Sequence, residues 1–372
     1  MEKKKEVWDY WDQQFAQDEV YFEPWTEMFE HHDSLADTKH ISSTLIYGNH
    51  LDTPPVFSIM TPAYRRPDGL KRALDSALNQ SYTLPYEIVV VDDSGDSLDN
   101  YEEIDALMKE YCSKHNNVIY YRNDSNLGVN DNWNRQAALC RSEWFCILHD
   151  DDMLKPDYLN TFNEKLPVFE REKVAICSAF FDMIIDEGAK SSQSIFIKGF
   201  ETLSRIRGDE LILLGIKDAL HFVYPNTTAT LYNTERFLTV GGLNKRWGVL
   251  ADAVFFTQCQ STFKNAILPK SLSIGNKGDD SATASPTVAL YCMASVYQRS
   301  KAIAKHLGYS EKKSEKLGAQ ASVYQELSLW TVGAEDYKKI RERLGISNTY
   351  NLWITKKLLR IKNIWVWLKT LF

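Results

Sequence analysis

Short apolar runs alternate with amphipathic stretches from residue 56 to residue 148. The runs are rich in β-branched and aromatic residues, which predicts strands, and between them apolar residues recur at spacings of three and four, which predicts helices. The predicted strands are 56–60, 87–91, 118–121 and 144–148, and the predicted helices begin near Pro67 and cover 100–114 and 130–140. This alternation favours an α/β fold in which a mostly parallel central sheet is flanked by helices.

Polar side chains gather where these predicted strands end. Parallel strands bring their carboxyl ends to one edge of a sheet, and ligands of such sheets bind there. The polar groups are Tyr64-Arg65-Arg66, Asp92-Asp93, Asn123 to Asn126 and Asp150-Asp151-Asp152. The sequence therefore predicts one ligand site at this edge.

The three consecutive aspartates that follow the fourth run carry closely spaced negative charge. Adjacent carboxylates repel one another, and desolvating them at a buried strand end is costly. A divalent cation would remove this conflict because hard cations take oxygen ligands, and it would also neutralise a diphosphate. The alternative is a solvated acidic turn. The alignment with three other polar strand ends favours the metal site.

The rest of the chain divides around this α/β segment. Trp8, Trp11 and Phe15 lie at helical spacing and predict an appended helix, followed by irregular chain that packs on the main domain or contributes to a homodimer contact. A Thr-Pro-Pro sequence at 53–55 marks the boundary. We expect an N-terminal extension over 1–53, a main domain over 54–285 and a helical C-terminal region over 286–372.

The composition and net charge indicate a globular protein and argue against some functional classes. The chain has 372 residues, 44% of them hydrophobic and 25% charged, which is ordinary for a globular protein. Its net charge of −7 argues against a nucleic-acid binder, which usually carries a basic field. Six cysteines without a CxxC pair indicate reduced thiols in a cytoplasmic protein. Neither a signal peptide nor a run of about 18 apolar residues that predicts a membrane span is found.

The last 21 residues differ from the rest of the chain in charge. Residues 352–372 carry five Lys or Arg residues, three Trp residues and no acid. A basic, Trp-rich amphipathic helix is typical of a segment that lies in a membrane interface. The alternative is a helix that docks on the protein itself. We expect peripheral attachment to the inner face of the cell membrane through this tail.

Four motifs in order resemble glycosyltransferases of family two, which have the GT-A fold. The motifs are the first strand and loop at 57–66, the second strand at 87–94, the segments Asn126-Leu127-Gly128 and Asn132-Trp133-Asn134, and the acidic segment at 148–157. Their order and spacing match over 55–160, which makes the resemblance far more specific than any one motif. It implies a nucleotide-sugar half over 54–160, an acceptor half over 161–285, and a divalent cation, Mn or Mg, as cofactor.

The resemblance also implies the donor pocket. Asp93 would accept a hydrogen bond from the base, with Asp92 alongside, and a carboxylate suits the imide N–H of uracil. The remaining residues implied in nucleotide binding are Pro62, Ala63, Tyr64 and Arg65 along the base and ribose, and Asn126, Gly128 and Asn134 in the wall. The alternative for Asp92 and Asp93 is a strand-ending turn, where Asp is common.

In the acidic segment the resemblance makes Asp151 the metal ligand and Asp152 the supporting acid. Asp150 would contact the ribose, or it would contact the metal ligands without binding the metal itself. The family usually has an acid where His149 stands, and an Asn where Arg65 stands. His149 would donate to a phosphate or pack beside the site.

A direct displacement at a sugar carbon needs a carboxylate that takes the proton of the acceptor hydroxyl. Gly241-Gly242 followed by Asp252 before an apolar helical run resembles the family's base segment, although Ala251 replaces its usual Glu. Asp252 is the candidate base, and capping of the helix is its alternative role. Lys277, in a glycine-flanked loop, would bind the diphosphate.

These features predict an inverting, metal-dependent glycosyltransferase. We expect it to use a nucleotide-diphospho-sugar, UDP-linked, and a glycan or lipid-linked glycan acceptor in bacterial surface polysaccharide synthesis. One alternative is a catalytically inactive, membrane-associated scaffold. Another is a metal-dependent nucleotidyltransferase, although the loop after the first strand lacks the glycines of a phosphate loop.

Overall fold

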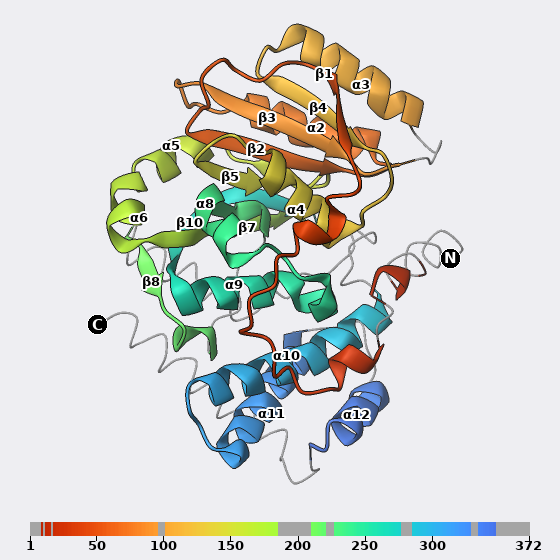
Figure 1. Cartoon of the computed structure of the whole chain (residues 1–372), viewed down its shortest axis with the longest axis vertical. Helices are drawn as coiled ribbons and strands as arrows, with labels where there is room; N and C mark the ends of the chain where they lie inside the picture. The colour runs from red at the N-terminus through yellow and green to blue at the C-terminus, as the bar shows by residue number, and fades with distance from the viewer. Residues whose placement is uncertain are drawn as a thin grey trace.

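A ten-stranded sheet forms the centre of the protein, with helices on both faces and a helical region at one end (Figure 1). The strand order is β1-β4-β3-β2-β5-β9-β7-β10-β6, and β8 pairs with β10. This computed structural model describes residues 9, 12–15, 18–95, 101–184, 210–220, 227–276, 285–328 and 334–346.

The first half of the sheet has the predicted architecture. Its parallel strands are β2 (Phe57–Ala63), β3 (Tyr86–Asp92), β4 (Val118–Asn123) and β5 (Trp144–Ile147). The helices between them are α2 (Pro67–Leu78), α3 (Tyr101–Lys114) and α4 (Val129–Leu139). Each element lies within a few residues of its expected position, and the polar strand ends meet at one edge of the sheet.

Both faces of these strands are buried, which explains their nearly continuous apolar sequence. On β3, Ile88 and Val90 pack on the face that carries α2 and α3. Val89 and Val91 pack on the opposite face, against residues of α4 and α9 such as Ala137 and Phe255. Because successive side chains of a strand alternate between faces, a continuous apolar run contributes to the hydrophobic cores on both faces of the sheet.

The second half of the sheet mixes strand directions. β9 (Thr230–Asn233) runs antiparallel between β5 and β7 (Val174–Ile184), and β10 (Lys264–Asn276) runs parallel to β7. The short strands β6 (Met153–Leu154) and β8 (Ile212–Leu214) pair antiparallel with β10. The helices here are α5 (Tyr158–Asn163), α6 (Leu166–Glu172), α8 (Thr234–Val240) and α9 (Ala251–Thr262). Parallel pairing is thus confined to β2–β5 and to the β7–β10 pair, within a central sheet that is flanked by helices as expected.

The N-terminal segment extends along the molecule to the sheet edge (Figure 1). Two 3₁₀ turns, η1 (Asp18–Tyr21) and η2 (Ala36–Thr38), precede β1 (Ser43–Tyr47), which pairs antiparallel with β4. We expected irregular chain here. β1 is a short edge strand without a regular alternation of buried and exposed residues, so its sequence carries little strand signal. Trp8 and Trp11 lie outside the described residues.

The C-terminal region is helical, as expected. It comprises α10 (Pro286–His306), α11 (Glu311–Ser328) and α12 (Ala334–Arg343), which lie together at the end of the molecule away from β1 (Figure 1). The N-terminal segment packs on α10, where the Tyr21 ring stacks on Tyr291 at a centroid distance of 4.2 Å. No helix among the described residues is long and apolar enough to cross a membrane. The basic tail 352–372 lies outside the described residues.

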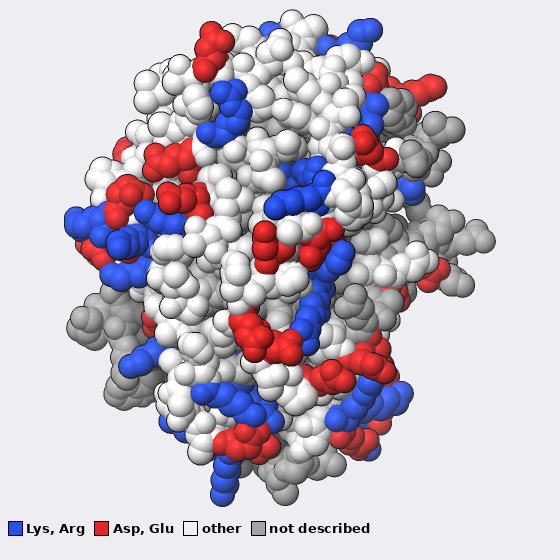
Figure 2. Space-filling model, viewed as in Figure 1, with Lys and Arg blue, Asp and Glu red and all other residues white. Residues whose placement is uncertain are grey.

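The described charges on one face of the protein are interspersed. Figure 2 shows acidic and basic side chains next to one another over most of the face that is drawn. Some charges of the described residues pair between elements: Lys301 on α10 contacts Glu311 on α11 at 2.8 Å, and Lys305 contacts the same carboxylate at 2.8 Å. Such exposed pairs orient neighbouring helices and add little stability.

Candidate active site

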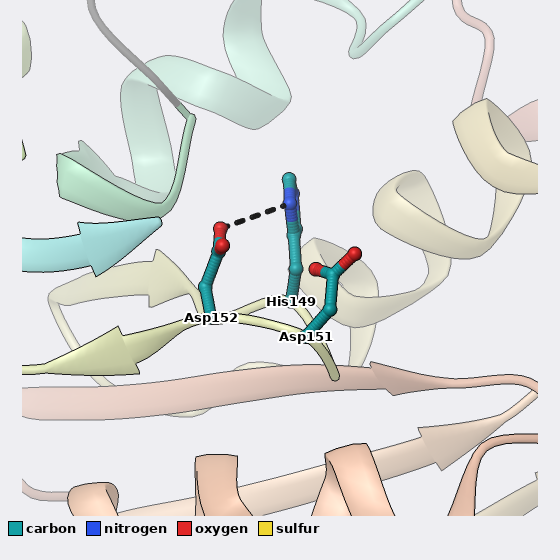
Figure 3. Close-up of side chains that lie close together, drawn as sticks. All are labelled: His149, Asp151 and Asp152. Atoms are coloured by element: carbon teal, nitrogen blue, oxygen red, sulfur yellow. Dashed lines mark ion pairs between the residues drawn. The ribbon is translucent and has the colours of Figure 1, made fainter. Parts of the chain in front are cut away.

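The loop between β5 and β6 carries a cluster of metal-binding side-chain types. His149, Asp151 and Asp152 project from it to the same side (Figure 3). One potential ligand atom from each lies within 4.8 Å of the others. A nitrogen and two carboxylate oxygens are ligands for divalent metals, so this donor set fits a divalent cation.

The first turn of α2 presses against this loop. A Cβ on Gly69 would lie 2.3 Å from the backbone oxygen of Asp150, so only glycine allows this approach. Arg66, which precedes α2, donates to Asp151 at 3.1 Å and to Asp150 at 3.4 Å. Burial raises the pKa of Asp150 to about 7, and the Arg66 charge opposes that rise. Arg66, which belongs to the polar group that follows β2, thus contacts the acidic loop directly.

The segment that precedes Arg66 also has a defined conformation. Arg65 adopts a φ of 58°, and its guanidinium lies 4.8 Å from the centre of the Tyr64 ring. A positive φ is uncommon for a non-glycine residue and often marks a functional loop. Pro62 and Ala63 end β2 and align with Val91 and Asp92 of β3. Four of the expected nucleotide residues are therefore contiguous at the sheet edge.

His149 is held on two sides by residues of other elements. Its ring stacks on Trp133 of α4 with a centroid distance of 5.0 Å, and its Nε2 lies 3.0 Å from Thr227 Oγ1. Its Nδ1 lies 3.6 Å from Asp152 Oδ2. Thr228 donates from Oγ1 to the same oxygen of Asp152. The imidazole therefore packs beside the acidic loop and also turns a nitrogen toward it.

Asp92 supports the turn that ends β3. It is fully buried and accepts hydrogen bonds from the Ser94 N–H and hydroxyl and from the Tyr120 hydroxyl. This is the strand-ending turn considered above as the alternative. Because Asp92 is fully buried, Asp93 is the one of these two aspartates that we expect to contact a nucleotide.

Asp93 is 4% exposed and anchors the loop before α4. Its carboxylate accepts from the backbone N–H groups of Leu127 (2.8 Å) and Gly128 (2.9 Å) and from the Asn123 amide (2.8 Å). Burial raises the pKa of Asp93 to about 7, and these three donors oppose the rise. Asn126 returns a hydrogen bond to the Asp93 carbonyl at 2.7 Å. Asp93, Asn126 and Gly128 therefore form one hydrogen-bonded unit.

Asn134, which we expected in the wall of the nucleotide pocket, makes two buried hydrogen bonds to the second half of the sequence. Its side chain is 1% exposed and bonds to both backbone groups of Leu243, beside the Gly241-Gly242 pair. It therefore joins α4 to the segment that precedes α9.

Asp252 lies in the first turn of α9, one residue inside its start. The N-cap position belongs to Leu250, so Asp252 is not the capping residue, although its carboxylate accepts from the Ala253 N–H at 2.6 Å. Burial raises the pKa of Asp252, and the charges of Arg299 and His149 oppose the rise. His149, in the candidate metal loop, thus interacts electrostatically with the candidate base.

Three side chains at this site had no assigned role in the sequence. Thr227 and Thr228 support His149 and Asp152, and buried Arg299 of α10 donates from Nε to Ala253 O (3.2 Å) and Thr257 Oγ1 (3.0 Å). Each acts through a contact between segments that are remote in sequence, which no local motif reveals. Lys277 lies outside the described residues.

Comparison with known proteins agrees with this geometry. Residues 58–226 match the model of glycosyl transferase family 2, and this part of the chain belongs to that family. With the sheet order described above, the protein has the GT-A fold.

Similar proteins cover different shares of the chain. An uncharacterized protein of Mycobacterium tuberculosis is 27% identical over 228 residues, which are 59% of this chain and 66% of that protein. Chondroitin synthase of Escherichia coli is 32% identical over 103 residues, 28% of this chain and 14% of the synthase. Among solved structures, a mannosyltransferase of Pyrobaculum calidifontis in complex with GDP-Man and Mn²⁺ has a TM-score of 0.47 at 14% identity, covering 97% of this chain and 99% of its own.

Proposed function

We propose that the protein is an inverting glycosyltransferase that moves a sugar from a nucleotide-diphospho-sugar to a hydroxyl of a glycan or lipid-linked glycan. The observation that carries the proposal is the cluster of His149, Asp151 and Asp152 in a segment that matches family 2, together with the buried carboxyl of Asp252, whose charge interacts with that of His149. A diphosphate-binding group and a base on opposite sides of a sugar carbon are what a direct displacement needs.

The donor is held by the polar strand ends. The Tyr64–Arg65 pair offers an aromatic and a guanidinium face for the base and ribose. Asp93 Oδ2 accepts from Gly128 N, and a carboxylate oxygen has capacity for a second donor such as the imide N–H of uracil. This favours a base that carries a ring N–H, and we propose a UDP-sugar as the donor. Asp150 and the loop residue Lys277 complete the donor set that we propose.

Asp151 and Asp152 would hold the divalent cation, Mn²⁺ or Mg²⁺. The cation would supply positive charge to the diphosphate of the donor. Arg66, at 3.1 Å from Asp151, offers a further positive charge on the same side of the loop. The scaffold and nucleotidyltransferase alternatives do not account for the buried carboxyl of Asp252, whose charge interacts with that of His149 in this cluster.

Asp252 acts as the base. The Ala253 N–H orients its carboxylate, and burial raises its pKa toward the range in which a carboxylate abstracts a proton efficiently. It takes the proton of the acceptor hydroxyl, and that oxygen attacks the anomeric carbon opposite the leaving nucleoside diphosphate. The new bond forms on the face opposite the broken one, so the configuration inverts.

The acceptor and the location rest on other support. Chondroitin synthase, by its name, makes a polysaccharide, which favours a glycan acceptor in surface polysaccharide assembly. The basic tail 352–372 favours peripheral contact with an anionic membrane surface. Deletion of the tail should move the protein from the membrane pellet to the supernatant, and an unchanged distribution would refute the membrane contact.

The test of the function begins with a panel of nucleotide sugars and Mn²⁺, with thermal stabilisation as the readout, because a ligand that binds only the folded state raises the melting temperature. Turnover is then measured as release of free nucleoside diphosphate with acceptor present. Asp252→Asn should keep donor binding and lose transfer. Release of pyrophosphate would show a nucleotidyltransferase instead, and binding without any turnover would show a scaffold.

A further inference from the structure

We propose that His149 is a third metal ligand and that its nitrogen makes this centre prefer Mn²⁺ and later first-row metals over Mg²⁺. The inference rests on the proposed function, because it concerns the cation that binds the donor diphosphate. The centre would contain one imidazole nitrogen and two carboxylates, from His149, Asp151 and Asp152.

The separation of His149 Nδ1 and Asp152 Oδ2, 3.6 Å, is the first observation. It is too long for a hydrogen bond. Two ligand atoms that each lie about 2.1 Å from one cation, at angles between 90° and tetrahedral, are roughly 3.0–3.4 Å apart. The observed distance exceeds this range by only a few tenths of an ångström, which a small side-chain rotation removes.

The orientation of the imidazole is the second observation. Nε2 lies 3.0 Å from Thr227 Oγ1, and Trp133 stacks on the ring. If the neutral ring donates from Nε2 to the threonine hydroxyl, its lone pair is on Nδ1, which is the nitrogen that faces Asp152. Metal-bound histidines commonly use their other ring nitrogen in this way, and that contact fixes the tautomer.

The support of Asp152 is the third observation. Thr228 Oγ1 donates to Asp152 Oδ2, while its neighbour Thr227 contacts His149. Both threonines are buried in the 3₁₀ turn η4 (Thr227–Ala229), which comes directly before β9. Two consecutive residues thus each hydrogen-bond one proposed ligand. In a solvated acidic turn we would not expect the side chains to be held in this way.

A nitrogen ligand changes which metal is favoured. Mg²⁺ binds chiefly oxygen ligands and keeps several waters, whereas imidazole suits transition metals. Replacing an acid by His149 therefore lowers the affinity for Mg²⁺ relative to Mn²⁺. His149→Asp restores the usual acid and should weaken this preference.

The experiment uses the full chain and Mn²⁺ alone, without donor. Pulsed electron paramagnetic resonance should detect a directly coordinated ¹⁴N nucleus in the wild-type protein. In His149→Asp the ¹⁴N coupling should vanish while Mn²⁺ still binds, and the ratio of Mn²⁺ to Mg²⁺ affinity measured by titration should fall at least about tenfold. The control is His40→Asp, at an exposed position outside the cluster, which should keep both the coupling and the ratio.

A second variant separates ligation from support. Thr227→Val keeps the side-chain shape and removes the hydroxyl, so Mn²⁺ should bind about tenfold more weakly with the ¹⁴N coupling retained. Mn²⁺ bound by the wild-type protein without ¹⁴N coupling would overturn the ligand role of His149 and leave the proposed function intact. Failure of the wild-type protein to bind Mn²⁺ or Mg²⁺, with or without donor, would overturn this inference together with the metal dependence.

Discussion

The side-chain amide of Asn134 holds both backbone groups of Leu243. Its Oδ1 accepts from Leu243 N at 2.7 Å, and its Nδ2 donates to Leu243 O at 2.8 Å. The two residues are 109 positions apart, and both are almost fully buried. This clamp fixes α4, which carries Trp133, against the segment that leads to Asp252.

Removing the clamp should destabilise the protein. Asn134→Ala leaves a buried N–H and a buried carbonyl without their partner, which costs about 2–6 kcal/mol at roughly 1–3 kcal/mol for each group. Urea unfolding measures this change. Asn160→Ala, which removes one solvent-accessible hydrogen bond to Ser81, is the control and should change the stability by less than about 0.5 kcal/mol. Equal effects would show that the clamp adds nothing.

The glycine before Leu243 provides a matched pair of variants. Gly242 has a φ of +75°, and a Cβ there would lie 2.5 Å from Asn134 Oδ1. Gly308 has nearly the same φ, +77°, but its Cβ would meet nothing within 4 Å. Gly308→Ala therefore reports only the cost of the left-handed backbone, about 1–2 kcal/mol. Gly242→Ala should cost clearly more in the same unfolding measurement, and equal losses would argue against a tight contact.

The contact between Gly69 and the acidic loop should matter for metal binding. A methyl group at Gly69 meets the backbone oxygen of Asp150, which cannot rotate away, so the loop must shift. We expect Gly69→Ala to weaken Mn²⁺ binding about tenfold, as measured by titration. Gly215→Ala, whose Cβ would have its nearest neighbour at 3.9 Å, is the control. Unchanged affinity in Gly69→Ala would mean that the loop tolerates displacement.

The sheet centre was predictable because its strands are buried on both faces. Runs such as Ile88–Val91 leave no ambiguity about an internal strand once helical stretches separate them. β1 was not predictable, because an edge strand pairs through its backbone and needs no apolar pattern. The position of β9 between β5 and β7 could not be predicted either, since strand order depends on contacts between residues that are far apart in the sequence.

The residues of the candidate site also divide into those that the sequence could predict and those that it could not. Asp93, Asp151 and Asp252 stand in local motifs, so the sequence could nominate them. Thr227, Thr228 and Arg299 lie outside those motifs and reach the site through the fold alone. The contact of Asn134 with Leu243 was not predictable for the same reason, because the two residues lie in different parts of the sequence.

The charge on Asp252 should set the acidic limb of the pH–rate profile. Transfer needs the ionised base, so kcat/KM falls as the pH decreases through the pKa of Asp252, which burial raises above the ordinary value of about 4. Arg299, on α10, opposes that rise. Arg299→Met should therefore move the limb to higher pH, and Arg299→Lys, which keeps the charge, should move it less. His149, Tyr232 and Cys292 also interact with this carboxyl and stay unchanged in both variants.

The same raised pKa has a consequence for stability. A carboxyl whose pKa is higher in the folded protein than in the unfolded chain binds its proton more tightly when folded, so its contribution is present at low pH and is lost as the pH rises through the folded pKa. Asp252→Asn, which cannot ionise, should therefore melt at a higher temperature than wild type near pH 8 and at nearly the same temperature near pH 4. Thermal denaturation of both proteins across this range checks the sign. A difference that is constant with pH would mean that Asp252 is not held in a desolvated, base-competent state.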